Sequence, residues 1–179
     1  MLTNITSLVK KAKKGNDRAF EQLIGSMREK LYRTAYAYVR NEQDALDIYQ
    51  EAIYKAYTSI HKLRKPESFP SWITKILVFQ AIDFIRKESK QFPTDDEKVF
   101  DGLITEESIK SITHSMDLTE AFKFLNPTYK TIILLRYYHE LSIKEIAEMM
   151  NCPEGTVSSN LSRAKKQLRP ILKEGYIYE

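Results

Sequence analysis

Residues 141–168 read LSIKEIAEMMNCPEGTVSSNLSRAKKQL, and this stretch predicts two helices joined by a tight turn. Ser142 can cap the first helix, because Glu145 three residues later completes a capping box. Leu141 and Ile146 occupy the two positions of a hydrophobic staple around that cap. The apolar residues of the helix recur at i, i+3, i+4 and i+7, which predicts a buried face made of Ile143, Ile146, Ala147 and Met150.

The turn and the second helix complete a helix-turn-helix pattern. Asn151 can take a left-handed conformation at the end of the first helix, and Pro153 can open the second helix in its first turn. The helical period gives the second helix an inward stripe of Val157, Leu161, Ala164 and Leu168. Its outward face consists of Gly155, Ser159, Ser162 and Lys166, with Ser158 and Arg163 on the flanks. Small polar side chains followed by basic ones suit the major groove of DNA, whereas an ordinary hairpin with a solvated basic face is the alternative.

The composition of the whole chain favours an all-α fold. The 179 residues are 42% apolar and 29% charged, which suffices for one large domain or two small ones. Only 5 Gly and 6 Pro interrupt long stretches of helical periodicity. The sequence contains no internal repeat and no extended run of alternating apolar and polar residues, so strands are not expected.

The charge is unevenly distributed along the chain. The net charge of +4 divides into +7 over residues 1–87, −4 over residues 88–115 and +1 over residues 117–179. Basic surface attracts phosphate through release of counterions, so the two ends of the chain are candidates for contact with nucleic acid. The acidic strip between them should avoid DNA, unless a basic channel in a partner protein takes it up.

Targeting signals and cysteine usage predict a cytoplasmic protein. No stretch approaches the roughly 18 consecutive apolar residues of a membrane span. The basic residues near the N-terminus follow a very short apolar stretch, which is the wrong order for a signal peptide. Cys152 is the single cysteine, so an internal disulfide is impossible.

Helical periodicity predicts two domains. In the first half it predicts helices at about 17–25, 27–40, 44–60 and 72–88, the last two capped by Asn41 and Ser71. The third of these helices has an apolar face of Ala45, Ile48, Ala52, Ile53 and Ala56. The segment HKLRKPESFPS between the last two helices contains two prolines and is predicted to be a loop. Further helices are predicted at 118–125 and 127–140. The expected architecture is thus two small helical domains, 1–88 and 116–179, joined by an acidic linker at 89–115.

No catalytic or metal-binding constellation is found in the sequence. His61, His114 and His139 are scattered, without the Cys/His spacing of a zinc site and without an HExxH motif. The acidic cluster Asp95-Asp96-Glu97 falls in the predicted linker, where solvation is the simpler explanation. We therefore predict no enzymatic activity, no catalytic residue, no metal and no cofactor.

Several motifs together resemble one known family. The stretch NPTYKTIILLRYYHELSIKEIAEMMNCPEGTVSSNLSRAKKQL closely resembles the promoter-reading domain of extracytoplasmic-function (ECF) sigma factors. The first half is similar as well, in KKGNDRAFEQL, DALDIYQEAIYKA and SFPSWITKILVFQAIDFIRK. The specific part is the pairing of DALDIYQE with a helix that carries Trp72, Asp83 and Arg86. The resemblance implies a sigma factor that recruits core RNA polymerase, reads two promoter elements and helps to open the duplex.

The resemblance implies three contact surfaces. The third helix would dock on core RNA polymerase through a stripe at i, i+3, i+4 and i+7 that consists of Asp47, Gln50, Glu51 and Tyr54. The loop and the fourth helix would hold the opened minus-ten element through His61, Lys62, Arg64, Lys65, Phe69, Lys75, Arg86 and Lys87. The minus-thirty-five element would be bound by Ser158, Ser159, Ser162, Arg163, Lys165, Lys166 and Arg136. Trp72 is predicted to be structural.

The sequence departs from the family pattern at a few positions. Leu77-Val78-Phe79 stands where an Ala-x-Asn is usual, so a base-contacting amide is missing. Ser158 and Asn160 stand where Lys or Arg is frequent, and Leu46 stands where an acid is common. These departures leave the promoter sequence and the affinity open.

The resemblance also implies partners, and one alternative function is left open. An anti-sigma factor anchored in the membrane is implied by the resemblance alone, and the acidic linker resembles the family's connector through polymerase. The alternative is a conventional helix-turn-helix regulator that binds duplex DNA by itself. That alternative explains the C-terminal half but not the combination of the DALDIYQE helix, the basic loop and the acidic linker.

Overall fold

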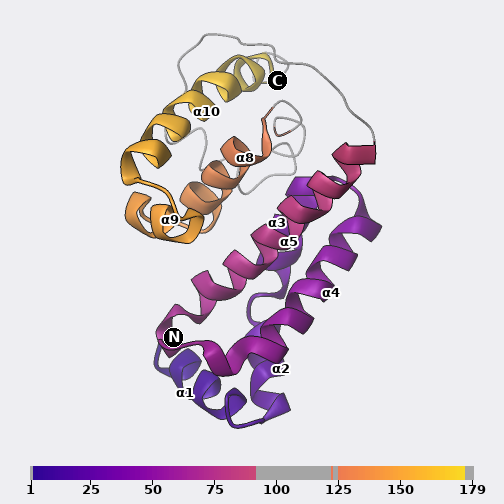
Figure 1. The fold of residues 1–179 in the computed structure, drawn as a ribbon, viewed down its shortest axis with the longest axis vertical. Coiled ribbons are helices and arrows are strands. Elements are labelled where there is room, and N and C mark those ends of the chain that lie inside the picture. The colour runs from indigo at the N-terminus through magenta and orange to yellow at the C-terminus, as the bar shows by residue number, and fades with distance from the viewer. Residues whose placement is uncertain (1, 92–121, 123–124, 176–179) are drawn as a thin grey trace. The chain divides into compact units, whose positions relative to one another are not determined.

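The computed structural model describes residues 2–91, 122 and 125–175, and the regular elements in this part of the chain are all helical (Figure 1). The prediction of an all-α fold is therefore confirmed. The chain separates into two compact units, Met1–Phe92 and Pro93–Glu179, which are described here one at a time. The predicted linker lies almost entirely outside the described residues, and so does most of the helix predicted at 118–125.

The helices of the first unit are α1 (Leu2–Ala12), α2 (Asp17–Gly25), α3 (Arg28–Val39), α4 (Glu42–Ser59) and α5 (Phe69–Gln91). The sequence analysis did not predict α1. Its signal is nonetheless present, because Ile5, Leu8, Val9 and Ala12 recur at i, i+3, i+4 and i+7. Val9 and Ala12 are buried, and α1 packs against α2.

The core of the first unit lies where α3, α4 and α5 pack against one another (Figure 1). α4 turns Ala45, Ile48, Ala52 and Ala56 into this core, as predicted. Because three of these side chains are methyl groups, the neighbouring helices can approach α4 closely. Ile53, which was expected on the same face, is only half-buried and lies beside the core. The predicted cap of α4 is confirmed by a 3.0 Å hydrogen bond from the Asp44 amide to Asn41 Oδ1.

The connection from α4 to α5 is more ordered than the predicted loop. It contains two short 3₁₀ turns, η1 (Ile60–Lys62) and η2 (Pro66–Ser68), and α5 begins directly after them. The prediction that Ser71 caps α5 is wrong. The helix already includes Phe69 and Pro70, because a proline in the first turn needs no amide partner. The Ser71 hydroxyl donates to the Ser68 carbonyl oxygen from within the helix, at 3.0 Å.

The second unit contains α8 (Pro127–Ile133), η4 (Leu134–Tyr138), α9 (Ile143–Met150) and α10 (Glu154–Gly175). Asn126 caps α8 by accepting a 2.9 Å hydrogen bond from the Tyr129 amide. The continuous helix predicted at 127–140 is interrupted, since η4 is a π-helical turn. After η4, Glu140 adopts a φ of 58° and reverses the chain toward α9.

The helix-turn-helix forms as the local signals predicted. Ser142 and Glu145 make the complete capping box of α9, and Asn151 ends that helix in a left-handed conformation with φ 52°. Pro153 lies just before α10 rather than inside it. It occupies the cap position, where its carbonyl oxygen accepts a hydrogen bond from the Val157 amide at 3.2 Å. In α9 Ile146 and Ala147 are buried as predicted, whereas Ile143 and Met150 are only half-buried and Met149 is the buried methionine. The inward stripe of α10 is confirmed, with Val157, Leu161, Ala164 and Leu168 all buried.

Candidate nucleic-acid interface

The face of α10 opposite its buried stripe is open to solvent. Its exposed side chains are Ser159, Ser162 and Lys166, and Ser158 and Arg163 are exposed on its flanks. At the start of the helix Gly155 faces open space, since a β-carbon built there meets no atom within 4 Å. A flat surface of small side chains ends in Arg163 and Lys166, so a DNA groove can approach the backbone of α10 closely and meet cations further along.

Two of the predicted DNA-contacting cations are partly engaged inside the second unit. Lys165 is half-buried, with its Nζ 5.4 Å from the centroid of the Tyr137 ring. Arg136 donates from Nη1 to the Leu141 carbonyl oxygen at 3.0 Å, which ties the π-helical turn to the start of α9. Both residues therefore help to hold the helix-turn-helix together, and their contact with DNA stays a prediction.

The connection between α4 and α5 presents a row of cations in the first unit. Its exposed side chains are His61, Lys62, Arg64 and Lys65, together with the acidic Glu67. Ile60, just before these residues, and Leu63, among them, are buried and anchor the segment to the core. Lys13 adds a second attachment by donating from Nζ to the Leu63 carbonyl oxygen at 2.7 Å. The cations are thus held on a fixed backbone, which suits a grip on a phosphate backbone.

The expectation that Phe69 contacts DNA is wrong. Its side chain is 0% exposed, and its ring centroid lies 5.9 Å from that of Trp72. Phe69 therefore anchors the first turn of α5 in the core. Trp72 is half-buried, which agrees with the structural role that the sequence predicted for it.

The remaining minus-ten candidates lie along α5. Lys75 is half-buried, whereas Arg86 and Lys87 are exposed. Arg86 Nη1 lies 3.8 Å from Asp83 Oδ1 in an exposed pair one turn apart, a pair of little energetic consequence. These residues extend the cationic character of the loop onto the helix that follows it.

The predicted polymerase-docking residues lie together on the exposed side of α4. They are Asp47, Gln50, Glu51 and Tyr54, and the Tyr54 side chain is 65% exposed. Their neighbours hold two of them weakly, because Gln43 Nε2 donates to Asp47 Oδ1 at 3.2 Å and Lys55 Nζ lies 3.6 Å from Glu51 Oε1. Four side chains with two carboxylates and one exposed aromatic ring suit a partner that offers both cations and apolar area.

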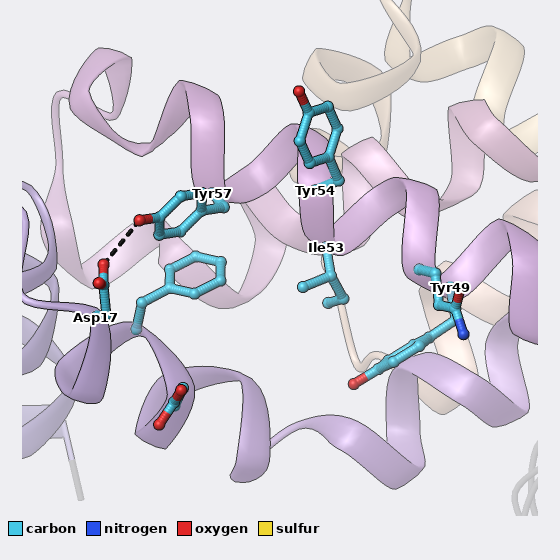
Figure 2. A pocket seen from close by; sticks show the side chains of 8 residues that line it. Asp17, Tyr49, Ile53, Tyr54 and Tyr57 are labelled. Carbon is cyan, nitrogen blue, oxygen red and sulfur yellow. Dashed lines mark hydrogen bonds between the residues drawn. The ribbon is translucent and has the colours of Figure 1, made fainter.

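A groove between α2 and α4 adjoins this docking stripe, with a volume of about 490 Å³ (Figure 2). It is lined by Asp17, Phe20, Glu21, Tyr49, Gln50, Ile53, Tyr54 and Tyr57. Gln50 and Tyr54 belong to both the stripe and the groove. The contribution of α2 was missed by sequence reasoning, although the repeat of Tyr49, Ile53 and Tyr57 every fourth residue marks a second apolar edge on α4.

One end of the groove is closed by a bond between its two helices. The Tyr57 hydroxyl donates to Asp17 Oδ1 at 2.7 Å, as the dashed line in Figure 2 marks. Phe20 meets the Tyr57 ring edge to face, with centroids 5.2 Å apart. The hydrogen bond to the Asp17 carboxylate, and then its negative charge, raise the pKa of Tyr57 above its ordinary value of 10.0. The groove walls are thus aromatic, while Asp17 and Glu21 make its α2 side acidic.

Family comparisons match both helical units. The model for sigma-70 region 2 matches residues 23–91, and the model for sigma-70 region 4 matches residues 115–168. These matches define the class as a sigma-70-type protein with its two conserved regions in the expected order.

Two relatives narrow the class. RNA polymerase sigma factor SigV of Bacillus subtilis is 44% identical over 147 residues, which cover 82% of this chain and 86% of SigV. ECF RNA polymerase sigma factor SigW of the same species is 31% identical over 95% of this chain and 97% of SigW. The chain therefore belongs to the ECF family of RNA polymerase sigma factors. Membership in this family removes the alternative of a conventional regulator.

Solved structures share the fold at low sequence identity. CnrH, in complex with the cytosolic domain of CnrY, has a TM-score of 0.69 and 19% identity, covering 96% of this chain and 98% of CnrH. The sigma factor RpoE of Bartonella quintana, in complex with the anti-sigma factor NepR, has a TM-score of 0.66 and 20% identity. The match covers 86% of this chain and 96% of RpoE.

The activity of the chain follows from its family. As a sigma factor it directs RNA polymerase to promoters, binding core RNA polymerase and promoter DNA as a non-catalytic subunit. Among the described residues, no helix combines the length and the apolar character that crossing a membrane requires.

Proposed function

We propose that the two helical domains, at residues 1–88 and 116–179, divide promoter recognition between them and are joined by the acidic linker at 89–115. In the second domain, the outward face of α10 reads the minus-thirty-five element. The single observation that carries this assignment is that Ser159, Ser162 and Lys166 are exposed opposite the buried stripe, with Ser158 and Arg163 exposed on the flanks of the same face. Arg163 reads a base edge, because its guanidinium fork can pair with guanine, whereas Lys166 suits phosphate.

In the first domain, the cationic connection and α5 hold the opened minus-ten element. His61, Lys62, Arg64 and Lys65 are exposed on a backbone fixed by buried neighbours, and Arg86 and Lys87 continue the cationic track. Such a track follows the backbone of single-stranded DNA.

The exposed side of α4 and the groove beside it dock on core RNA polymerase. The occupant would be a helical segment that carries cations toward Asp47 and Glu51 and inserts an apolar side chain against Ile53. The support is complementarity, because the residues lining the groove include Asp17 and Glu21 but no cation. Apolar contact at Ile53 would supply affinity, and the charges would orient the segment.

The docking assignment predicts the effect of Asp47→Arg combined with Glu51→Arg. Core polymerase binding should be lost while the fold is retained, because both side chains are exposed. Glu29→Arg with Glu42→Arg is a matched control, since it changes the charge of the same unit by the same amount at other exposed positions. Polymerase affinity is measured by fluorescence anisotropy, and equal affinity of the two double variants would contradict the assignment.

We also infer where the protein works and what restrains it. Core RNA polymerase is cytoplasmic, so we place the protein in the cytoplasm. An anti-sigma factor, anchored in the membrane, is expected to cover the docking or DNA-binding surfaces. The support is the fold shared with RpoE, which is described in complex with the anti-sigma factor NepR.

One experiment tests the proposed function as a whole. Purified core RNA polymerase is incubated with and without the chain on fragmented genomic DNA, and the 5′ ends of the RNA are sequenced. We expect defined start sites that share two spaced upstream motifs. Start sites with a minus-ten motif alone would contradict the role assigned to α10.

A further inference from the structure

Helix α2 forms one wall of the groove beside α4 but packs mainly against α1. Among the described residues, the helices that pack closely on α4 are α3 and α5. Phe20 turns inward from α2 and is buried, whereas Asp17 and Glu21 are exposed on the groove side of the same helix. The width of the groove therefore depends on side chains that reach from one helix to the other.

Tyr57 of α4 makes this connection at one end of the groove. Its hydroxyl donates to Asp17 Oδ1 at 2.7 Å, and Tyr49 lies at the opposite end of the α4 wall (Figure 2). The Tyr57 ring meets the Phe20 ring, with centroids 5.2 Å apart. Among the described residues that line the groove, the bond between Tyr57 and Asp17 is the hydrogen bond that crosses from α4 to α2.

The two contacts of Tyr57 constrain α2 in different ways. The ring contact buries apolar surface and tolerates small displacements, whereas a hydrogen bond is directional and fixes where the carboxylate of Asp17 stands. Asp17 is exposed, so its second carboxylate oxygen can accept from a cation of a bound segment. The hydrogen bond thus sets both the position and the orientation of a negative charge on α2.

The bond acts at the end of α2 where its position is decided. Asp17 is the first residue of the helix, and Gly15 just before it has a φ of 85° in the turn from α1. Fixing this residue fixes the start of the helix against α4. A wall that is already in place favours binding, because a partner then does not have to order it.

We propose that Tyr57 is a positioning residue for the binding of core RNA polymerase. By holding Asp17, it keeps α2 at the distance from α4 that the incoming segment of polymerase requires. This role rests on the proposed docking of that segment in the groove, and it places a cation of the segment opposite Asp17. The Tyr57 hydroxyl acts through Asp17 and makes no contact with the polymerase itself.

The test measures the affinity of the full chain for core RNA polymerase by fluorescence anisotropy. Tyr57→Phe removes only the hydroxyl and keeps the ring that meets Phe20. Tyr32→Phe is the matched control, because it removes the hydroxyl of another tyrosine in the same unit, half-buried on α3. Tyr57→Phe is also made in Asp17→Ala and Asp17→Asn backgrounds. Alanine has no acceptor, whereas asparagine keeps an oxygen that accepts a hydrogen bond but carries no charge.

We expect Tyr57→Phe to weaken core binding about threefold to tenfold, as the loss of one hydrogen bond does, and Tyr32→Phe to leave it unchanged. The slope of log affinity against log salt should stay at its wild-type value in Tyr57→Phe, because no charge is removed. In the Asp17→Ala background Tyr57→Phe should have no further effect, and in the Asp17→Asn background it should weaken binding again. Melting curves of every variant show that the compared chains are fully folded at the assay temperature.

Wild-type affinity of Tyr57→Phe would overturn the proposal. An effect that persists in Asp17→Ala would overturn it as well, because the hydroxyl would then contact the polymerase directly. So would an effect that vanishes in Asp17→Asn, because the charge alone would then account for it. Asp47→Arg with Glu51→Arg separates this role from the docking. If that double variant loses core binding and Tyr57→Phe does not, only the positioning role fails, whereas if neither loses binding, the docking on α4 fails too.

Discussion

Arg163→Ala should change which minus-thirty-five sequences the holoenzyme prefers without changing the fold. The Arg163 side chain is exposed on the flank of α10, and the packing of that helix rests on other residues, which are buried. Truncating an exposed side chain of this kind changes the free energy of unfolding by at most about 0.5 kcal/mol. A bidentate arginine–guanine pair contributes about 1–3 kcal/mol of discrimination between bases, which corresponds to a factor of about 5 to 150.

Lys166→Ala is the matched control for this prediction. Lys166 is exposed on the same helix, three residues further along, but its ammonium suits phosphate rather than a base edge. Its loss should weaken all promoters to a similar extent and lower the slope of log affinity against log salt by about one. The two variants therefore remove one positive charge each from α10 and differ in what they do to sequence preference.

The assay is competition among promoters with a randomised minus-thirty-five element, read by sequencing the fragments that each holoenzyme retains. Arg163→Ala should relax the preference at one base pair, and Lys166→Ala should leave the sequence profile unchanged. If Arg163→Ala keeps the wild-type preference at every position, the base contact is refuted. Loss of core polymerase binding by Arg163→Ala would refute the division of tasks between the domains.

Three further predictions concern the core, the groove and the cap of α9. Phe69→Ala should destabilise the first unit by about 3–5 kcal/mol, measured by urea denaturation, and a change below about 0.5 kcal/mol would contradict its burial. Ile53→Glu should weaken core polymerase binding about tenfold, because it places a carboxylate beside the acidic side of the groove, and unchanged affinity would remove Ile53 from the interface. Hydrogen bonds from Ser142 lower the pKa of Glu145 below 4.5, so the cap stabilises the second unit above about pH 4.5 and is lost as the pH falls through the lowered pKa. Ser142→Ala should cost about 0.5–2 kcal/mol at pH 7 and flatten this acid dependence of unfolding, and an unchanged pH profile would contradict the assignment.

The sequence predicted the features that depend on local chemistry. The capping box at Ser142 and Glu145 and the left-handed Asn151 involve residues a few positions apart, so their interactions are visible as spacing. Local spacing alone also led to an error at Ser71. That residue has the right chemistry for a cap, but Pro70 and the 3₁₀ turn before it allow the helix to begin earlier. Competing local signals of this kind are decided by packing that the sequence does not display.

Features that need two distant segments were beyond sequence reasoning. The bond between Asp17 and Tyr57 joins residues 40 positions apart, and the groove exists only where α2 approaches α4. Phe69 shows that a residue type can suggest a surface role that the packing then excludes. Next to a basic loop it has the residue type of a stacking platform, yet its complete burial depends on the packing of the helices around it.

The proposed docking surface and the proposed minus-ten surface share one core, and this gives a way to tell surface residues from structural ones. α4 carries the proposed docking stripe on its outer side. Its inner side packs small side chains against α3 and α5. A polar link also joins α4 to α5, since Lys55 Nζ on α4 donates to Gln80 Oε1 on α5 at 2.8 Å, while Glu51 Oε1 on α4 itself lies 3.6 Å from the same Nζ. A core variant lowers the folded fraction, so polymerase binding and minus-ten binding must fall together. A surface variant alters one activity at a constant folded fraction, and only residues that separate the two activities in this way belong to one interface.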